Sequence, residues 1–386
     1  MKMIDAQCSL LGRMIFPLCL FYSSLVFSFH YDEESGGDAK WDNPGTYVIE
    51  IGGEIFSAFD AVDNHWMGGL AAIMVDVDVR VNNRLSLFGA FHFDSDVWHG
   101  FMNKPAFQRQ EEGFAYDIDL EVEEFFATWL AFPDKLEFSA GRMFSVISYA
   151  NQLHLADFQF NMKPRIFTDY FGSNHGLALD GFSSKFNTSN DLLTASVFVE
   201  AAKNGFDRDL LILTGTTDLI FRMDDVSYGF RAFGYFDHQR SNHPAFMYIP
   251  SGELPFMVDL KDGLGFNAWG AGIHLLWEMQ THASIFFQSE FVSRSLGEKS
   301  LRGGYAFLIF SHTPKLSSSF MFQQLEIPHF REKGWSTTKE TAYTFGLSYF
   351  PFEGNRLRIE YSRFHDSPFY NHMLLAKWTF FMDLGR

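Results

Sequence analysis

Residues 116–123 read Tyr-Asp-Ile-Asp-Leu-Glu-Val-Glu, so apolar and acidic side chains alternate from one residue to the next. Residues 73–80 (Ile-Met-Val-Asp-Val-Asp-Val-Arg) and residues 356–362 (Arg-Leu-Arg-Ile-Glu-Tyr-Ser) show nearly the same alternation. Successive side chains of a β-strand point to opposite faces, whereas a helix would scatter these residues around its circumference. The three stretches therefore predict strands with one face in an apolar medium and the other in water.

Similar segments recur along the whole chain, and most are about 10 to 15 residues long. Strands of soluble proteins usually have about 5–6 residues, whereas a tilted membrane strand needs about 9–11. After residue 40 no run of about 20 apolar residues occurs, so no helical span is predicted. The pattern predicts an all-β fold, a transmembrane antiparallel up-and-down β-barrel of about sixteen strands, with 14 and 18 as alternatives. The predicted strands lie near residues 46–59, 70–81, 84–94, 116–131, 135–148, 175–186, 191–201, 210–223, 226–238, 265–279, 283–294, 302–313, 316–326, 341–351, 356–365 and 371–382.

Short and long connections alternate between these strands. The short ones carry turn chemistry, as in Asn82-Asn83, Pro133-Asp134 and Asp224-Asp225. The predicted long links are residues 60–69, 95–115, 149–174, 202–209, 239–264, 295–301, 327–340 and 366–370. With both termini in the periplasm, every short turn is periplasmic and every long link extracellular, which is typical of outer-membrane barrels.

The aromatic content supports the same interpretation. The chain has 47 Phe, and aromatic residues make up 18% of it. Many rings fall near predicted strand ends, including Trp129, Tyr349, Trp378 and Phe381, where two girdles at the membrane interfaces are expected. The soluble alternatives are a large β-sandwich or a propeller, which explain neither the long strands nor the asymmetric links.

The first 29 residues have the pattern of a secretory signal. Lys2 and Arg13 precede an apolar core, residues 14–29, which polar residues follow. A membrane anchor and a lipoprotein signal are the alternatives. We expect a signal peptide (1–29), a short N-terminal extension (30–45) and a barrel (46–386). Both cysteines, Cys8 and Cys19, lie in the signal, so the exported chain would have no disulfide and no thiolate metal site.

The formal net charge is −17. Nucleic acids are bound by basic stripes, so this charge argues against a nucleic-acid partner. It agrees with a water-filled lumen that favours cations.

Two stretches carry a resemblance to a known family. Residues 372–381 resemble the closing strand by which barrel-assembly machinery recognises outer-membrane proteins, although residues 382–386 follow where an aromatic terminus is usual. The sixteen strands with alternating links resemble bacterial outer-membrane porins, both general and substrate-selective. In those porins the third extracellular loop folds into the lumen, and the corresponding link is residues 149–174.

A local similarity is narrower. Gly141-Arg142-Met143-Phe144, Asn151 with His154, Pro164 and Tyr170-Phe171-Gly172 are similar to a segment of phosphate-porin-like and zinc-regulated porins. Those relatives often have several His in this segment, whereas this chain has one. Neither zinc nor phosphate selectivity is therefore carried over.

Alternation also predicts which charged residues face the lumen. The acidic candidates are Asp76, Asp78, Asp117, Asp119, Glu121 and Glu123. The basic candidates are Arg80, Arg142, Arg222, Arg231, Arg356 and Arg358. The inward-folded link adds His154, Asp157, Lys163, Arg165 and Asp169 at the expected constriction. Opposed acidic and basic walls would create a transverse field across the pore, while the alternative for each residue is a solvated or paired charge on the wall.

Motifs of enzymes are absent from the sequence. No Gly-rich phosphate loop, no paired-His zinc motif and no Gly-x-Ser-x-Gly elbow occurs, so no cofactor, metal or catalytic residue is predicted. The first hypothesis is passive diffusion of small hydrophilic solutes through a monomer or homotrimer embedded in outer-membrane lipid. The alternatives are a structural or adhesive barrel that binds a partner through its long loops, and an outer-membrane hydrolase.

Overall fold

A computed structural model describes most of the predicted barrel. The predicted signal, residues 1–29, and residues 30–44 of the extension lie outside the described residues. The described ranges are 45–60, 65–95, 118–133, 135–151, 160–161, 164–166, 178–190, 192–204, 210–239, 245–246, 257–258, 267–279, 283–296, 299–331, 334–352, 354–367 and 371–383.

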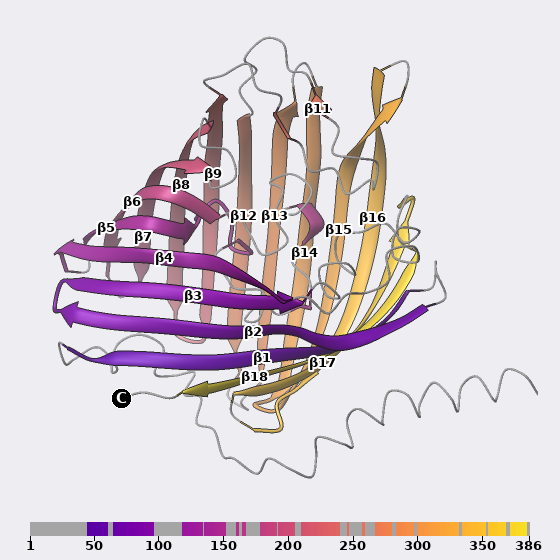
Figure 1. Cartoon of the computed structure of the whole chain (residues 1–386), viewed down its shortest axis with the longest axis horizontal. Coiled ribbons are helices and arrows are strands. Elements are labelled where there is room, and N and C mark those ends of the chain that lie inside the picture. The colour runs from indigo at the N-terminus through magenta and orange to yellow at the C-terminus, as the bar shows by residue number, and fades with distance from the viewer. Residues whose placement is uncertain are drawn as a thin grey trace, which may run out of the picture.

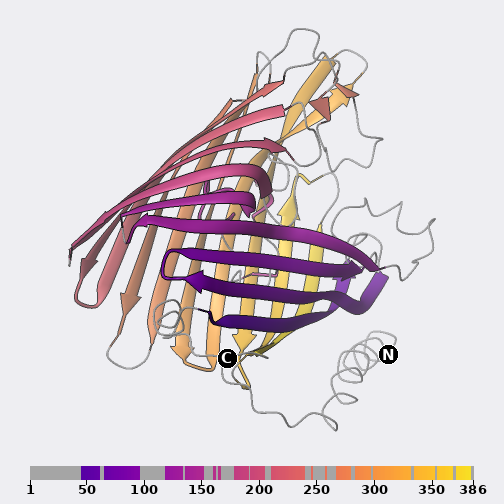
Figure 2. The same cartoon turned by 60° about the vertical axis from the view of Figure 1, so that its left-hand side comes forward.

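Sixteen antiparallel strands form one closed barrel (Figures 1 and 2), which confirms the predicted fold class and strand number. In Figure 1 the strands β1–β4 cross the view almost horizontally, whereas β12–β16 stand nearly upright. The barrel strands are β1 (Tyr47–Asp60), β2 (His65–Asn82), β3 (Leu85–Ser95), β4 (Ile118–Phe132), β5 (Leu136–Phe144), β6 (Ala178–Ser189), β7 (Leu193–Asn204), β8 (Leu210–Met223), β9 (Val226–Gln239), β12 (Asn267–Glu278), β13 (Ser284–Leu296), β14 (Lys299–Thr313), β15 (Leu316–Arg331), β16 (Gly334–Tyr349), β17 (Asn355–His365) and β18 (His372–Asp383). Two short strands, β10 (Ala245–Phe246) and β11 (Met257–Val258), pair with each other between β9 and β12.

The first and last strands close the ring. They pair without a register shift from Glu50 opposite Asp383 to Asp60 opposite Met373. Lipid offers no hydrogen bonds, so a closed ladder is the arrangement in which strands can cross a bilayer without an unpaired edge.

Among the residues that the structure describes, no helix has the length and apolar character needed to cross a membrane.

The short turns form as their side chains predict. The Asn82 Oδ1 accepts hydrogen bonds from the backbone N–H of Arg84 (2.8 Å) and of Leu85 (3.0 Å). Asn190 makes the same kind of bond to Leu192 (3.0 Å) and to the next residue. These Asx turns replace ladder hydrogen bonds where the chain reverses, so local sequence fixes this end of the barrel.

Three links expected to be long are short. Only residues 61–64 separate β1 from β2, residues 297–298 separate β13 from β14, and residues 332–333 separate β15 from β16. Residues 334–340 are mostly polar and show no apolar alternation, yet their backbone pairs with β15. Ladder hydrogen bonds do not require apolar side chains, so these strands continue beyond the segment that the pattern can detect.

The outer face carries the apolar band. On β12 the inward positions are buried and the outward positions exposed, in strict alternation from Asn267 to Ile273. Trp269 and Trp277 both face outward, 58% and 45% exposed. Eight residues on a strand tilted by about 40° rise about 20 Å along the barrel axis, close to the height of an outer-membrane apolar band.

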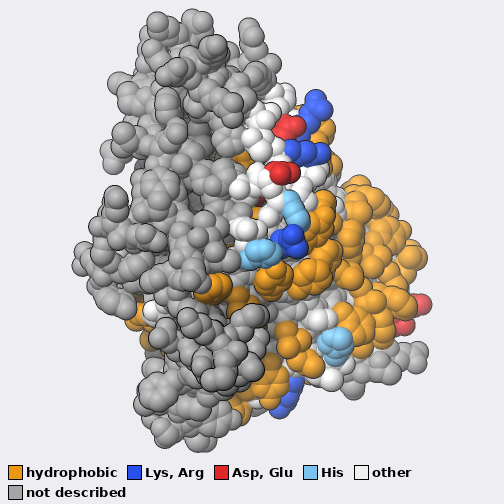
Figure 3. Space-filling view, turned by 90° about the vertical axis from the view of Figure 1, so that its right-hand side faces the viewer, with side chains coloured by type: hydrophobic (Ala, Val, Ile, Leu, Met, Phe, Trp, Pro, Cys, Tyr) orange, Lys and Arg blue, Asp and Glu red, His pale blue; other side chains and the backbone are white. Residues whose placement is uncertain are grey.

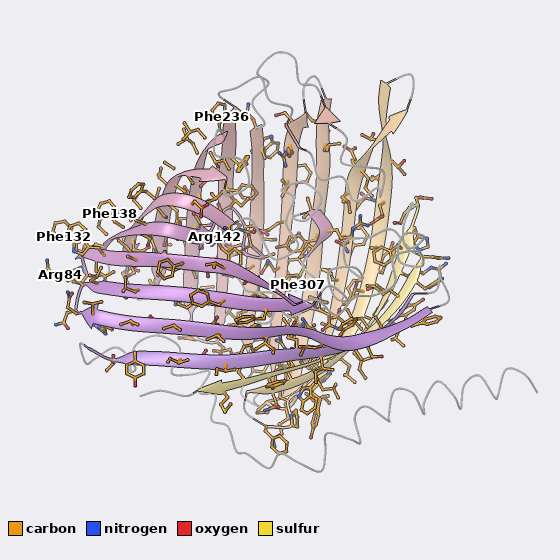
Figure 4. The ribbon with its side chains drawn as sticks, in the orientation of Figure 1. Arg84, Phe132, Phe138, Arg142, Phe236 and Phe307 are labelled. Atoms are coloured by element: carbon orange, nitrogen blue, oxygen red, sulfur yellow. The ribbon has the colours of Figure 1, made fainter. Side chains whose placement is uncertain are left out.

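Of the rings named as girdle candidates, two more lie on this outer surface and one does not. Trp129 and Tyr349 are exposed on it, and Phe132 and Phe138 lie at its edge in Figure 4. Phe381, expected in a girdle, lies opposite Gly52 and packs against the buried pair Ala72 and Met74 instead. The lipid-facing rings therefore follow strand parity rather than distance from a strand end.

Candidate functional site: the lumen and the strap inside it

The chain that follows β5 runs along the inner wall of the barrel. We call residues 145–166 the strap, of which 145–151, 160–161 and 164–166 are described. At its start the Glu124 carboxylate of β4 accepts a hydrogen bond from the Phe144 N–H at 2.8 Å. Just before it, Gly141 has φ +134°, and a Cβ there would lie 2.3 Å from the Phe125 carbonyl oxygen. Glycine thus lets β5 bend toward β4 and direct the chain inward.

Glu200 on β7 makes the next contact with the strap. Its carboxylate accepts the Ser145 hydroxyl at 2.5 Å and the Val146 N–H at 3.2 Å, together with the Thr214 hydroxyl of the neighbouring strand. Ser145 and Glu200 are 0% and 2% exposed. The barrel wall therefore supplies the acceptors that the buried strap backbone needs.

Glu290 on β13 repeats this arrangement. It accepts the Ser148 hydroxyl at 2.5 Å and the Tyr149 N–H at 3.0 Å, and the Tyr305 hydroxyl of β14 also donates to it. Ser148 and Glu290 are separated by 142 residues in sequence. Two carboxylates that are far apart in the sequence, one on β7 and one on β13, thus bind the strap in the same way.

The Tyr149 side chain lies in a charged cluster between these contacts. Its hydroxyl donates to Asp218 of β8 at 2.8 Å. The Arg231 guanidinium of β9 bridges to the same carboxylate at 2.8 Å and lies 3.8 Å from the centre of the Tyr149 ring. Burial raises the pKa of the Tyr149 phenol above its usual range, so the phenol keeps its proton and remains a donor. The His274 ring of β12 meets the Tyr149 ring edge-on at 4.8 Å.

The second described part of the strap contacts β15, β16 and β17. The Asn161 N–H donates to Glu360 at 2.8 Å, and the Arg165 N–H donates to the Gln323 Oε1 at 2.9 Å. The Arg165 guanidinium forms an ion pair with Glu340. Arg165 and Glu340 are 4% and 0% exposed, so this is a buried pair.

An apolar core fills the space between the strap and the wall. The strap contributes Ile147, Ala150, Phe160 and Ile166, and inward-facing residues of β6–β9 and β12–β15 complete the cluster. The Phe160 ring meets Phe307 at 5.4 Å, and Phe307 lies within the barrel in Figure 4. The described parts of the strap therefore pack against the inner wall formed by these strands.

The wall carboxylates that hold the strap, Glu124, Glu200, Glu290, Glu340 and Glu360, were not among the predicted residues. A signal for two of them exists in the sequence. Glu200 and Glu290 each interrupt an otherwise weakly charged strand at an inward position, Ser-Val-Phe-Val-Glu and Gln-Ser-Glu-Phe-Val. A lone inward carboxylate among apolar and hydroxyl neighbours requires a donor from elsewhere in the protein.

The predicted acidic residues lie on β2 and β4 as follows. Asp76 and Asp78 alternate with the outward-facing valines, and both are partly exposed. The backbones of Asp119 and Glu121 lie opposite Asp94 and His92 in the register. Asp117 lies outside the described residues.

Glu123 differs from the other acidic candidates. The register between β3 and β4 shifts between Ala90 and Phe91, which leaves Glu123 as an extra residue beside Glu124. Its carboxylate lies 3.2 Å from the His92 Nδ1, and it is only 2% exposed. Glu123 is thus a buried, paired group rather than a solvated one.

Four of the basic candidates lie on the inward faces of three strands, two on β17, one on β8 and one on β9. Arg356 and Arg358 alternate with outward residues of β17, and Arg358 lies opposite Lys377 of β18. Lys377 is 2.8 Å from Glu54. Arg222 is exposed at the turn end of β8 and donates to the Thr194 hydroxyl at 2.7 Å, whereas Arg231 is buried in the Tyr149 cluster.

The fifth and sixth basic candidates differ from each other. Arg80 lies opposite Ser86, on the inward face with Asp78, and is partly exposed. Arg142 lies opposite Phe125 and Asp180, on the outward face. This corrects its predicted place in the lumen. Within β5, Ser139 and Met143 are buried and Phe138 is exposed, which puts Arg142 on the outer side, and Phe144 is buried only where the strand ends.

Of the predicted constriction residues, only Arg165 is described. The other four, His154, Asp157, Lys163 and Asp169, lie outside the described residues. Across the described ranges, no group of three or more His, Cys, Asp or Glu is placed to hold a metal ion.

No protein-family model and no curated protein matches the sequence. Solved structures do match the barrel. OprB of Pseudomonas putida at high pH has a TM-score of 0.60 and 9% identity, over 88% of this chain and 94% of that one. OmpF of Salmonella typhi in complex with daunomycin has a TM-score of 0.58 and 9% identity, over 88% and 98%.

A third match is a loop L8 deletion mutant of OmpT, an outer membrane protein of Vibrio cholerae. Its TM-score is 0.57 at 11% identity, over 88% of this chain and 100% of that one. At such identities the likeness concerns the fold. The closed ring of sixteen strands, the outward apolar band and these structures together show that the chain has the fold of bacterial outer-membrane porins.

Proposed function

We propose that the protein is an outer-membrane porin that lets small hydrophilic solutes diffuse passively through its lumen, with a preference for cations. The proposed path passes the inward-facing charged residues of β1 and β2, on the side of the lumen away from the apolar core. The strap narrows the lumen and leaves this path to water.

The observation that carries the proposal is an inward-facing charged wall that stays in contact with solvent. Glu50, Asp76, Asp78 and Arg80 face the lumen from β1 and β2, and each is partly exposed. Charged groups are stable inside a barrel only where water or a partner solvates them. An aqueous path along β1 and β2 explains their presence.

The distribution of charged residues supports a preference for cations. It also supports an electric field directed along the wall, from the basic residues of β17 and β18 to the acidic residues of β1 and β2. Carboxylates predominate among the described inward groups of β1 and β2, whereas Arg356, Arg358 and Lys377 lie on β17 and β18. These walls are far apart in the sequence but adjacent in the barrel, because β18 pairs with β1. Clefts lined by one sign of charge raise the local concentration of counter-ions.

Single-channel recording tests the pore itself. The refolded barrel, checked by its heat-modifiable migration, is added to a planar bilayer in a symmetric salt solution. We expect current steps of a defined size. Repeated silence from correctly folded protein would contradict the proposal and favour a closed structural barrel.

The acidic wall is tested by a change of ion selectivity. We expect the Asp76→Asn and Asp78→Asn double variant to move the zero-current potential in a salt gradient toward that of a less cation-selective pore, because two lumen charges are lost. Asp180→Asn is the matched control, since Asp180 lies opposite Arg142 on the outer face. Equal potentials for the wild type and the double variant would remove these residues from the filter.

A further inference from the structure

A group of basic side chains lies on the outer face of the barrel, at the end away from the chain termini. We call Arg302 (β14), Lys339 (β16), Arg363 and His365 (β17) and His372 (β18) the outer basic patch. Arg363 lies directly opposite His372, and His365 lies opposite Thr341, two residues from Lys339. Their sequence neighbours Leu301, Glu340, Phe364 and Met373 are buried inside the barrel, so these five positions face outward.

The patch borders the apolar band. On β16 the outward residues beyond Thr341 toward the turn end are Tyr343, Phe345 and Leu347, and the last two are 55% and 50% exposed. The Tyr343 ring meets His365 edge-on at 5.9 Å. The Tyr361 hydroxyl is 2.5 Å from the His372 Nδ1. Tyrosines with an apolar body and a polar tip mark the level where acyl chains meet head groups.

Figure 3 shows Lys, Arg and His side chains, with acidic side chains between them, along the border of a hydrophobic surface. The side chains of Arg302, Lys339 and Arg363 make no hydrogen bond or ion pair with the rest of the protein in the part that the structure describes. Two acidic residues lie close to this row. Glu326 lies opposite Lys339 and accepts the Arg302 backbone N–H at 3.0 Å, and the exposed Asp366 follows His365. The patch is therefore a surface with excess positive charge and free donors.

With the barrel in a membrane, outward cations at this level would lie beside lipid head groups rather than in bulk solvent. A guanidinium can bind two phosphate oxygens at once, and an ammonium contributes a compact charge. We propose that the outer basic patch binds the phosphate head group of an anionic lipid, with Arg363 as the central ligand. The inference rests on the proposed location of the barrel in a membrane. The acyl chains of that lipid would lie along the outward side chains of β16 and β17.

The test compares lipid retention by the wild type and by an Arg363→Gln and Lys339→Gln double variant. Each barrel is purified in zwitterionic detergent, titrated with phosphatidylglycerol or phosphatidylcholine, and analysed by native mass spectrometry. Cations near an anionic lipid surface each contribute a several-fold gain in affinity, so we expect the double variant to retain phosphatidylglycerol roughly 20-fold more weakly. Both substitutions are on exposed side chains, so folding should not change.

Arg222→Gln is the matched control, because Arg222 is an exposed cation at the other end and on the inner face. It should retain phosphatidylglycerol as the wild type does. Equal retention of the two lipids by the wild type, or equal retention of phosphatidylglycerol by wild type and double variant, would overturn the inference.

Two further results would also overturn it. Displacement of the lipid by millimolar inorganic phosphate would identify a site for free anions. A changed oligomeric mass with unchanged lipid retention would identify a contact between copies of the chain. Lipid retention in detergent does not require conduction. A barrel that does not conduct but retains phosphatidylglycerol would argue only against the porin function. A barrel that conducts but does not retain phosphatidylglycerol would argue only against this lipid site.

Discussion

A Glu290→Ala barrel should conduct with frequent partial closures and a lower mean current than the wild type. Glu290 accepts hydrogen bonds from the Ser148 hydroxyl, the Tyr149 N–H and the Tyr305 hydroxyl. Without it these buried donors lose their acceptor, at a cost of about 1–3 kcal/mol for each unsatisfied group. The strap would then detach from the β13 wall and enter the aqueous part of the lumen.

Single-channel recordings at constant voltage measure this effect as open-channel noise and as the distribution of current levels. Glu290→Gln keeps one carbonyl acceptor for the Tyr149 N–H, so it should give an intermediate result. Glu278→Ala removes an exposed carboxylate from the turn end of β12 and should behave as the wild type. A quiet Glu290→Ala channel with wild-type current would show that this contact does not hold the strap.

The second large effect is expected on stability. Arg231→Met should lower the free energy of unfolding by about 3–5 kcal/mol, because it leaves the buried Asp218 carboxylate without its cation. Asp218 and Arg231 are 6% and 4% exposed and 2.8 Å apart. The substitution also removes the guanidinium from the Tyr149 ring, a contact worth up to about 2 kcal/mol when it is shielded from water.

Urea titration of the refolded barrel, followed by tryptophan fluorescence, measures this loss. Arg222→Met is the control on the adjacent strand. Arg222 is exposed, and among the contacts described its side chain bonds only to the Thr194 hydroxyl. Its replacement should therefore change stability by no more than about 0.5 kcal/mol. Equal unfolding midpoints for the two variants would mean that the Asp218–Arg231 pair contributes little to the fold.

Much of the fold could be predicted because its determinants are local. The alternation in residues 73–80 and 356–362 is a property of neighbouring residues, and so is the Asx-turn chemistry of Asn82 and Asn190. A period of two with strands of this length leaves few architectures other than a barrel. The strand number and the short turns followed from these signals. Polar continuations such as residues 334–340 were missed, because backbone pairing leaves no trace in their side chains.

The position of each site residue was harder to predict, since parity is reset wherever the ladder is irregular. The extra residue Glu123 places two successive glutamates, Glu123 and Glu124, in buried positions. Alternation alone could not decide that Arg142 faces outward, because β5 has no strongly apolar face. The register with Phe125 decides it.

By itself the sequence determined a closed ring of about sixteen strands with an apolar outer face, because hydrogen-bonding geometry and side-chain alternation act between near neighbours. The pairing of the strands decided between sixteen and the alternatives of 14 and 18. Only the tertiary structure decided how the strap divides the lumen. Its contacts with Glu290 and Glu360 join residues separated by 142 and 199 positions. Such pairs form only after the barrel has closed and brought the two walls around the strap, so no local pattern encodes them.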